Sequence, residues 1–281
     1  MRLLNPYTYI NPTFDMSDIK IIYAPNGAVM PKAGIFMRSM QAQLPPEETA
    51  AMEAEWAKAL AKEPLENEDT VSVRFINLET GDLKVAPSDY KSWKTTAKKG
   101  FYKRFGDMYI PNALNVQMLA ETADGQLVLG TRPPKEDGKM PAFQVPGGML
   151  TMADSQNGHI APEIAAAREF TEEVGPVPVK DIAYLGASFY AGRLITTLYY
   201  TAQLAMTAGE LTAWRQVHQG EIKDFKAFPQ EHYVPMTDEG IQKARETGRL
   251  RETAEVGLIL KGRQKLGSEW FQRACPKRMR G

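Results

Sequence analysis

One segment, residues 162–175, limits most strongly what this chain can fold into. It begins with proline, which suits the first turn of a helix, and ends with glycine, which is typical of the position after the last turn. Glu169, Glu172 and Glu173 lie within one turn, so their carboxylates project from one helix face. Such carboxylates repel one another unless a cation offsets their charge, and oxygen ligands without Cys or His favour Mg²⁺ or Mn²⁺. Considered alone, the pattern is better explained by a solvated acidic helix.

The residues around this helix carry a more specific signal. Residues 168–175 read Arg-Glu-Phe-Thr-Glu-Glu-Val-Gly, and the stretch Val145-Pro-Gly-Gly148 precedes them. This pattern resembles the box of the Nudix hydrolase family, whose second half reads Arg-Glu-apolar-x-Glu-Glu-x-Gly. Every defined position of that half, through the glycine, is matched. The resemblance extends over about residues 112–230, which is under half of the chain.

The first half of the box departs from the family pattern. Arg168 follows Gly148 by 20 positions where the pattern has 14, so the loop between them carries six extra residues. Counted back from the arginine, the first glutamate of the box is replaced by Ile160. Asp154 is an alternative outer carboxylate, but aspartates in loops are mostly exposed, so we expect it to face solvent. For His159 we likewise expect a polar loop residue.

The resemblance implies a fold and a mechanism. It implies an α/β/α sandwich with a mixed sheet, and metal-dependent hydrolysis of a phosphoanhydride bond with Mg²⁺ or Mn²⁺ as the cofactor. By the same resemblance, Glu172 and Glu173 are direct metal ligands and Glu169 is a third ligand or the base that accepts the proton of water. Arg168 would orient Glu169, and Gly148 would approach the metal through its backbone carbonyl.

Three residues outside the box are candidates for substrate binding or catalysis. Arg132 ends a predicted strand and Arg193 precedes another, and both positions suit a phosphate clamp. A surface arginine is an equally good explanation for each. Glu221 is a candidate base, because some family members recruit an acid from a downstream loop. An exposed loop glutamate is the interpretation we favour for it.

The chain before the box domain predicts a separate small α+β module over residues 1–105. Residues 19–23 predict a strand. Residues 45–69 predict an amphipathic helix with an acidic, solvated face, and residues 71–85 predict a β-hairpin around Glu-Thr-Gly-Asp. Residues 106–281 would then form the Nudix domain with a C-terminal helical extension.

Within this second region, apolar runs separated by turn residues predict further strands. Residues 114–120 and 126–132 flank an Asp-Gly turn, and residues 182–186 and 194–204 form two later runs. Together with the box helix, these runs predict a domain that mixes strands with helices.

Composition excludes several classes of protein. The 34 basic and 34 acidic residues sum to zero, so no global field favours nucleic acid or an anionic membrane. Cys275 is the only cysteine, and the chain has no apolar run of the roughly 18 residues that a spanning helix needs. We therefore expect a cytoplasmic protein with a small-molecule nucleotide substrate, and without a membrane or nucleic-acid partner. A homodimer is a family-level expectation only.

The function that fits these observations is hydrolysis of a nucleoside diphosphate linked to another group, such as a nucleotide sugar, with the N-terminal module gripping the far end. Two alternatives remain open. Ile160 and the inserted loop would suit a Nudix-fold module that senses a nucleotide with impaired catalysis. Basic residues in 91–104 and 273–280 would suit an RNA-cap or other nucleic-acid-processing enzyme. The salt dependence of substrate affinity separates the last alternative from the first two.

Overall fold

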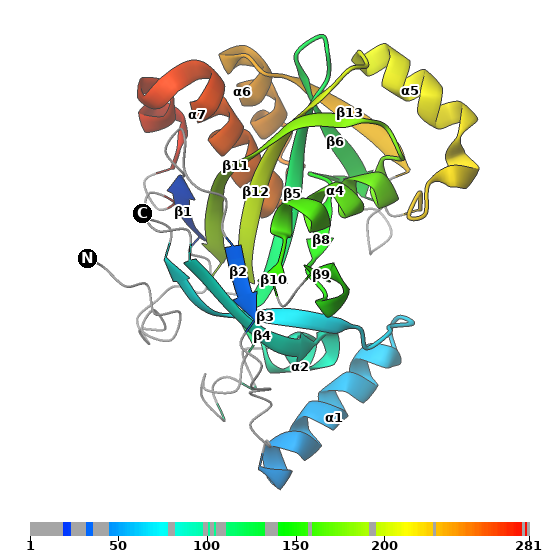
Figure 1. Cartoon of the computed structure of the whole chain (residues 1–281), viewed down its shortest axis with the longest axis vertical. Helices are drawn as coiled ribbons and strands as arrows, with labels where there is room; N and C mark the ends of the chain where they lie inside the picture. The colour runs from blue at the N-terminus through cyan, green and yellow to red at the C-terminus, as the bar shows by residue number, and fades with distance from the viewer. Residues whose placement is uncertain are drawn as a thin grey trace.

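The computed structural model describes residues 19–23, 32–35, 45–77, 82–97, 101, 104, 111–132, 140–156, 159–190, 195–226, 229–276 and 279. Figure 1 shows a long curled sheet with helices on both of its faces.

The central part of the sheet is mixed. β5 (Ala113–Glu121) runs parallel to β12 (Ile195–Leu204), and β11 (Val179–Tyr190) lies antiparallel on the other side of β12. β1 (Ile19–Tyr23) adds a further antiparallel strand to β11. These strands confirm the apolar runs that the sequence predicted as strands. Their mixed arrangement is the one that the resemblance implied.

A second group of strands leads to the glycine pair that precedes the box helix. β6 (Gln126–Arg132) pairs with both β13 (Gln230–Pro235) and β7 (Ala142–Gln144). β8 (Gly147–Met149) then returns antiparallel to β5. The glycine pair is thereby fixed against the middle of the central strand.

The sheet continues through strands that come early in the sequence. β3 (Asp69–Asn77) and β4 (Asp82–Asp89) form the predicted hairpin, and β2 (Lys32–Ile35) lies parallel to β4. At the far end, β10 (His159–Ile160) pairs with both β2 and β9 (Ser155–Gln156). The last two strands belong to the loop between Gly148 and the box helix.

The early strands are joined directly to the later ones. The Val71 amide donates to the Leu150 carbonyl at 3.2 Å, and the Val73 amide donates to the Asn112 carbonyl at 2.8 Å. Both valines are buried in one apolar cluster with Phe170 of the box helix. The strands on the two sides of the expected boundary at residue 105 therefore share a sheet and a core.

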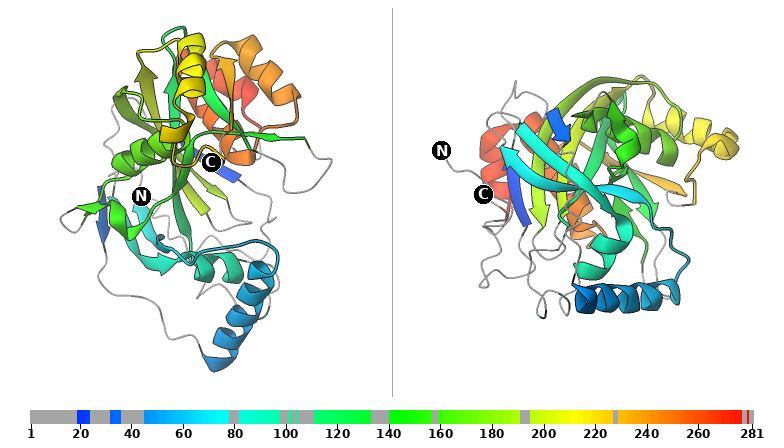
Figure 2. Two further views of the ribbon diagram at one scale, coloured as in Figure 1. Left: turned by 90° about the vertical axis from the view of Figure 1, so that its right-hand side faces the viewer. Right: turned by 60° about the horizontal axis from the view of Figure 1, so that its bottom comes forward.

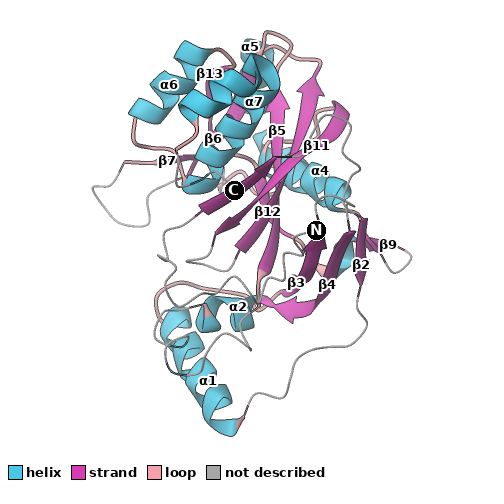
Figure 3. Ribbon diagram, turned by 90° about the vertical axis from the view of Figure 1, so that its left-hand side faces the viewer, coloured by secondary structure: helices cyan, strands magenta, loops and turns pink. Residues whose placement is uncertain are grey.

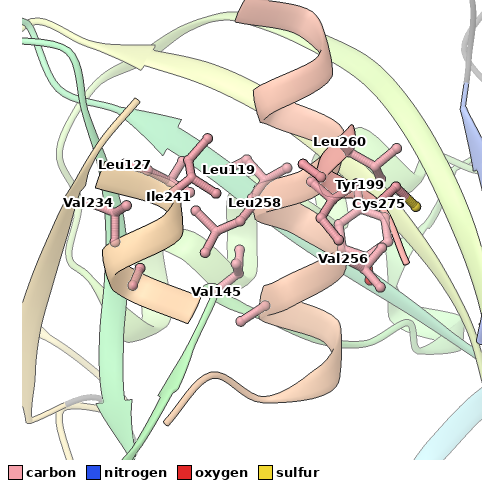
Figure 4. Packing of buried hydrophobic residues seen from close by; sticks show 14 of the residues in the cluster. Leu119, Leu127, Val145, Tyr199, Val234, Ile241, Val256, Leu258, Leu260 and Cys275 are labelled. Carbon is pink, nitrogen blue, oxygen red and sulfur yellow. The ribbon is translucent and has the colours of Figure 1, made fainter. Parts of the chain in front are cut away.

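Helices cover both faces of the sheet and give the α/β/α layering (Figures 1 and 3). α4 (Pro162–Glu173) packs on one face, where its Phe170 contacts the apolar cluster that contains Val116. α6 (Asp238–Glu246) and α7 (Glu252–Ala274) cover the other face, where Leu258 packs with Leu119 and Tyr199 (Figure 4). α6 and α7 are the expected C-terminal helical extension.

Two helices lie at the opposite end of the molecule from α6 and α7 (Figures 1 and 2). α1 (Pro46–Leu60) is the predicted acidic helix, and α2 (Tyr90–Thr96) is a helix within the basic and aromatic stretch. Trp56 packs edge-on against Tyr90, with ring centroids 6.3 Å apart.

Two basic residues of the stretch 91–104 that the structure describes pair with the acidic helix α1. Lys91 forms an ion pair with Glu53, and Arg104 forms one with Glu47. Opposite charges on the two segments therefore offset one another.

In the ranges that the structure describes, no helix is long and apolar enough to cross a membrane.

Candidate active site

The last turn of α4 is held by the segment that follows β12. Within α5 (Ala208–Val217), the buried Arg215 donates hydrogen bonds of 2.8 Å to the carbonyls of Glu173 and Val174. A cation at this position also complements the negative end of the helix dipole. Gly175 has a φ of 127° and lies so close to the Trp214 ring that a Cβ would overlap it, which explains why glycine ends this helix.

Glu173 is the most buried carboxylate of the box. Its residue is 7% exposed, and its Oε2 accepts a 2.9 Å hydrogen bond from the Gly147 amide. Burial raises the pKa of Glu173 to about 8, although the Gly147 hydrogen bond opposes this shift. A buried carboxylate with a raised pKa is typical of a functional site.

Glu169 lies beside the second glycine of the pair. Its carboxylate is 2.8 Å from Arg168 Nη1, and a Cβ on Gly148 would overlap that carboxylate. Burial raises the pKa of Glu169 to about 7, and Arg168 opposes the shift. The contact with Arg168 is the one expected of a residue that orients Glu169. The close approach of the Glu169 carboxylate explains why position 148 is a glycine.

Glu172 is held between two cations. Arg168 Nη1 is 3.2 Å from Glu172 Oε2, and Lys223 Nζ is 2.8 Å from Oε1. Lys223 lies in the loop after α5, where the Asp224 amide also donates to the Glu172 carbonyl at 2.8 Å. This loop therefore contacts the box helix through both its backbone and a side chain.

Asp154 corrects the expectation of a solvent-facing loop aspartate. Its side chain is only 4% exposed, and it forms a two-point contact with Arg168, with Oδ1 to Nε at 2.8 Å and Oδ2 to Nη2 at 3.1 Å. Its Oδ2 also accepts from the Thr151 amide at 2.8 Å, which fixes the turn η1 (Met152–Asp154). The two-point contact fixes the plane of the guanidinium.

Asp154 also places the six extra residues. It is the sixth residue after Gly148, which is the spacing of the first acid in the family pattern, so the insertion follows this position rather than preceding it. The extra residues include β9 and β10, and Ile160 of β10 is buried in the core. Ile160 is therefore a core residue, and counting forward from Gly148 would have found the acid. His159 is exposed, but it lies in β10 rather than in a loop.

The three outlying candidates have different outcomes. Arg132 is half-buried, its Nη1 is 3.4 Å from Gln144 Oε1, and its charge acts to lower the pKa of Glu173, so it lies near the box. Glu221 is exposed on the turn η2 (Gln219–Glu221). Arg193 lies outside the described residues. Sequence reasoning missed Lys223 and Asp224, which lie two and three positions beyond Glu221, the loop glutamate that it selected.

As the side chains stand, no three His, Cys, Asp or Glu residues in the described ranges converge closely enough to hold a metal ion. Arg168 and Lys223 instead draw two of the carboxylates toward themselves. The chemistry of the donors nevertheless fits a hard divalent cation, since all are oxygen ligands. Burial disfavours the charged forms of Glu169 and Glu173, and a cation would favour them.

Comparison with known proteins gives the family. Similar solved structures include a NUDIX hydrolase from Nitrosomonas europaea (16% identity, TM-score 0.35, covering 54% of this chain and 89% of that one). The MutT protein from Methanosarcina mazei Go1 is 15% identical with a TM-score of 0.36 (54% and 94% covered), and the ORF135 protein of E. coli is 19% identical with a TM-score of 0.34 (59% and 94% covered). The search of curated proteins finds no match. Residues 111–249 match the family model of the NUDIX domain, so the chain belongs to the Nudix hydrolases, a family of pyrophosphohydrolases.

Proposed function

We propose that this Nudix hydrolase cleaves, with Mg²⁺ or Mn²⁺, the phosphoanhydride bond of a nucleoside diphosphate linked to another group, such as a nucleotide sugar. One observation supports the proposal most directly. Glu169, Glu172 and Glu173 lie on the last turn of α4, and two of them contact or adjoin the glycine pair of β8. Three buried or half-buried carboxylates at one end of a helix are costly to keep without a cation.

The proposed metal ligands are the side chains of Glu172 and Glu173, with Glu169 as a third ligand or as the base, and the carbonyl of Gly148. A divalent cation bound there supplies Lewis-acid stabilisation of the phosphate oxygens and a template for the attacking water. Arg168 orients the Glu169 carboxylate through the contact at 2.8 Å and is itself fixed by Asp154. The protein thus supplies positioned acceptors before substrate arrives.

Two residues near the carboxylates are suited to the phosphates of the substrate. Arg132 is held by Gln144 close to Glu173, and we propose that it clamps a phosphate. Glu169, whose pKa is raised to about 7, has a proton affinity suited to accepting the proton of water near neutral pH. Glu221 stays a predicted candidate for the catalytic base, and Arg193 stays a predicted candidate for binding a phosphate.

The proposal that the substrate carries a second group beyond the diphosphate rests on the placement of the N-terminal strands. The Val71 amide bonds the carbonyl of Leu150, only two residues beyond Gly148, so β3 lies against the glycine loop. A segment in that position is suited to contact the group beyond the phosphates.

In the part of the chain that the structure describes, neither alternative function has an observation in its favour. The sensing module was suggested by Ile160, and Asp154 now provides the acidic partner of Arg168. The nucleic-acid track was suggested by residues 91–104, where Lys91 and Arg104 pair with acidic residues of α1.

The test is a hydrolysis screen with nucleoside diphosphate sugars, dinucleoside polyphosphates, NAD(H), ADP-ribose, CoA and nucleoside triphosphates. We expect turnover of a diphosphate-linked compound with Mg²⁺ or Mn²⁺, loss of turnover in chelator, and recovery when the metal is restored. Equal product formation without metal would refute the metal assignment. Preference of the intact protein for triphosphates would refute the substrate class.

A further inference from the structure

Two buried amides on β5 have oxygens without a hydrogen-bond partner in the described part of the chain. Gln117 is 7% exposed and Asn115 is half-buried, yet Gln117 Oε1 and Asn115 Oδ1 are both shielded from solvent and unpaired. Buried polar atoms are paired in the great majority of cases, so an exception requires an explanation.

Both amides lie on the sheet face opposite to the box helix. Val116 and Met118 belong to the apolar cluster that contacts α4, whereas Leu119 belongs to the cluster that contacts α7. Because side chains alternate along a strand, Asn115 and Gln117 share the face of Leu119. α7 covers this face at Leu119 and Tyr199, as Figure 4 shows, and the amides occupy the preceding positions of the same strand.

The amides adjoin the candidate active site across β8. Gln117 is the register partner of Gly147, and a Cβ on Gly147 would be 3.0 Å from Gln117 Cγ. The amide of the same Gly147 donates to Glu173 Oε2. One residue of β8 therefore separates the unpaired glutamine from a proposed metal ligand.

The Tyr199 hydroxyl, on the same face, is satisfied within the protein. The Tyr199 hydroxyl lies 3.1 Å from Ser188 Oγ and donates to the Thr253 carbonyl at 3.2 Å. Tyr199 is the register partner of Gln117 on β12. A buried polar group on this face can therefore find a partner within the protein, and the Gln117 oxygen does not.

We propose that Gln117, with Asn115, is a specificity-determining residue that pairs with the hydrogen-bonding edge of the nucleobase of the substrate. A primary amide offers a donor and an acceptor side by side, as the edges of the nucleobases do. An unpaired buried amide destabilises the folded protein, so an apolar side chain would serve folding better at this position. This inference rests on the proposed function, because it gives the nucleoside end of that substrate its binding site.

The first test separates a ligand-binding amide from a structural one by the sign of a stability change. Gln117→Met keeps the length of the side chain and removes its polar atoms. We expect the melting temperature of the full chain to rise by about 2–8 °C, because an unsatisfied polar group is removed. Gln203→Met is the matched control, since the Gln203 amide donates to Glu121 at 3.2 Å, and it should lower the melting temperature. A fall for Gln117→Met as large as that of the control would overturn the inference.

The second test measures binding without turnover. Titration calorimetry in chelator would give the affinities of AMP, GMP, CMP and UMP for the wild type and for Gln117→Met. We expect the wild type to prefer one base by at least about tenfold, and the variant to lose that preference. Equal affinities in the wild type, no binding of any of the four, or a preference that survives in the variant would overturn the inference.

This readout is independent of hydrolysis. If base preference is found and lost as expected but no diphosphate compound is hydrolysed, the proposed function fails and the base site stands. If hydrolysis is found with equal turnover for every base, the base site fails and the proposed function stands.

Discussion

Replacing Asp154 by asparagine tests the assignment of the acidic position in the first half of the box. The change keeps the size of the side chain and removes its charge. In the folded protein this charge is nearly inaccessible to solvent and meets the Arg168 guanidinium at 2.8 and 3.1 Å. Burial acts to lower the pKa of Arg168, but the Asp154 hydrogen bond and the neighbouring carboxylates raise it overall. The guanidinium is therefore positioned chiefly by this aspartate.

The magnitude follows from what the variant loses. A hydrogen bond to a charged group contributes about 1.5–3 kcal/mol, and Arg168 is one-third exposed, so water replaces part of the interaction. Arg168 also keeps its contacts with Glu169 and Glu172. The orientation of Glu169 is weakened rather than lost, and we expect Mn²⁺ affinity and kcat/KM to fall by about 10–100-fold, as is typical when a residue behind a metal ligand is changed.

The assay combines Mn²⁺ titration by electron paramagnetic resonance with steady-state kinetics and urea unfolding of the same samples. Asp154→Glu retains the charge and should recover part of the Mn²⁺ affinity. Ile160→Val tests the position found by counting back from Arg168, and should change Mn²⁺ affinity by less than about twofold because Ile160 is a core residue. Normal Mn²⁺ affinity and kcat/KM in a folded Asp154→Asn protein would refute the assignment.

Three further predictions concern the site and its support. Glu173→Gln should lower kcat by at least about 10²-fold while unfolding in urea is unchanged, and a near-normal rate would return this helix face to a solvated role. Gly148→Ala should lower kcat/KM by a similar factor because its Cβ overlaps the Glu169 carboxylate, and unchanged kinetics would contradict that geometry. Glu121→Gln should destabilise the fold by about 3 kcal/mol at pH 7, measured by urea unfolding, because Lys261 is left buried without its 3.1 Å partner. Burial acts to raise the pKa of Glu121, but Lys265 and Lys261 lower it below 4.5, so this stability is present above pH 4.5 and the difference between variant and wild type should shrink as the pH falls further.

The parts of the fold that could be predicted are those whose signal is local. α4 begins at Pro162 and ends before Gly175 because both residues act through their own backbone. The strands at residues 114–120 and 194–204 follow from runs of apolar residues. The helix at Tyr90–Thr96 was not predicted, because its N-cap at Asp89 is followed by a basic aromatic run without a clear apolar period.

The parts of the site that could not be predicted depend on contacts between distant residues. Asp154 is polar, and its burial is accounted for by the Thr151 amide and by its pairing with Arg168, 14 residues away in sequence. Arg215 and Lys223 contact the end of α4 from about 40 and 50 residues away in sequence, and no local pattern predicts either contact. Long-range pairing of this kind is invisible to periodicity, which reports only on the faces of one element.

The six extra residues in the box link the early strands to the box helix. β10 pairs with β2 on one side and with β9 on the other, and only Ala161 separates its last residue from Pro162, where α4 begins. Ile160 packs in the same cluster as Val71 and Phe170, so the insertion is part of the core rather than a free loop. Removing residues 1–105 would take away β1, β2, β3 and β4 of this sheet and expose that core to water, at a cost of roughly 25 cal/mol for each Å² of apolar surface. The contribution of the early strands to substrate binding must therefore be measured by point substitutions in the full chain, because a truncated protein would lose activity through its fold whatever those strands contact.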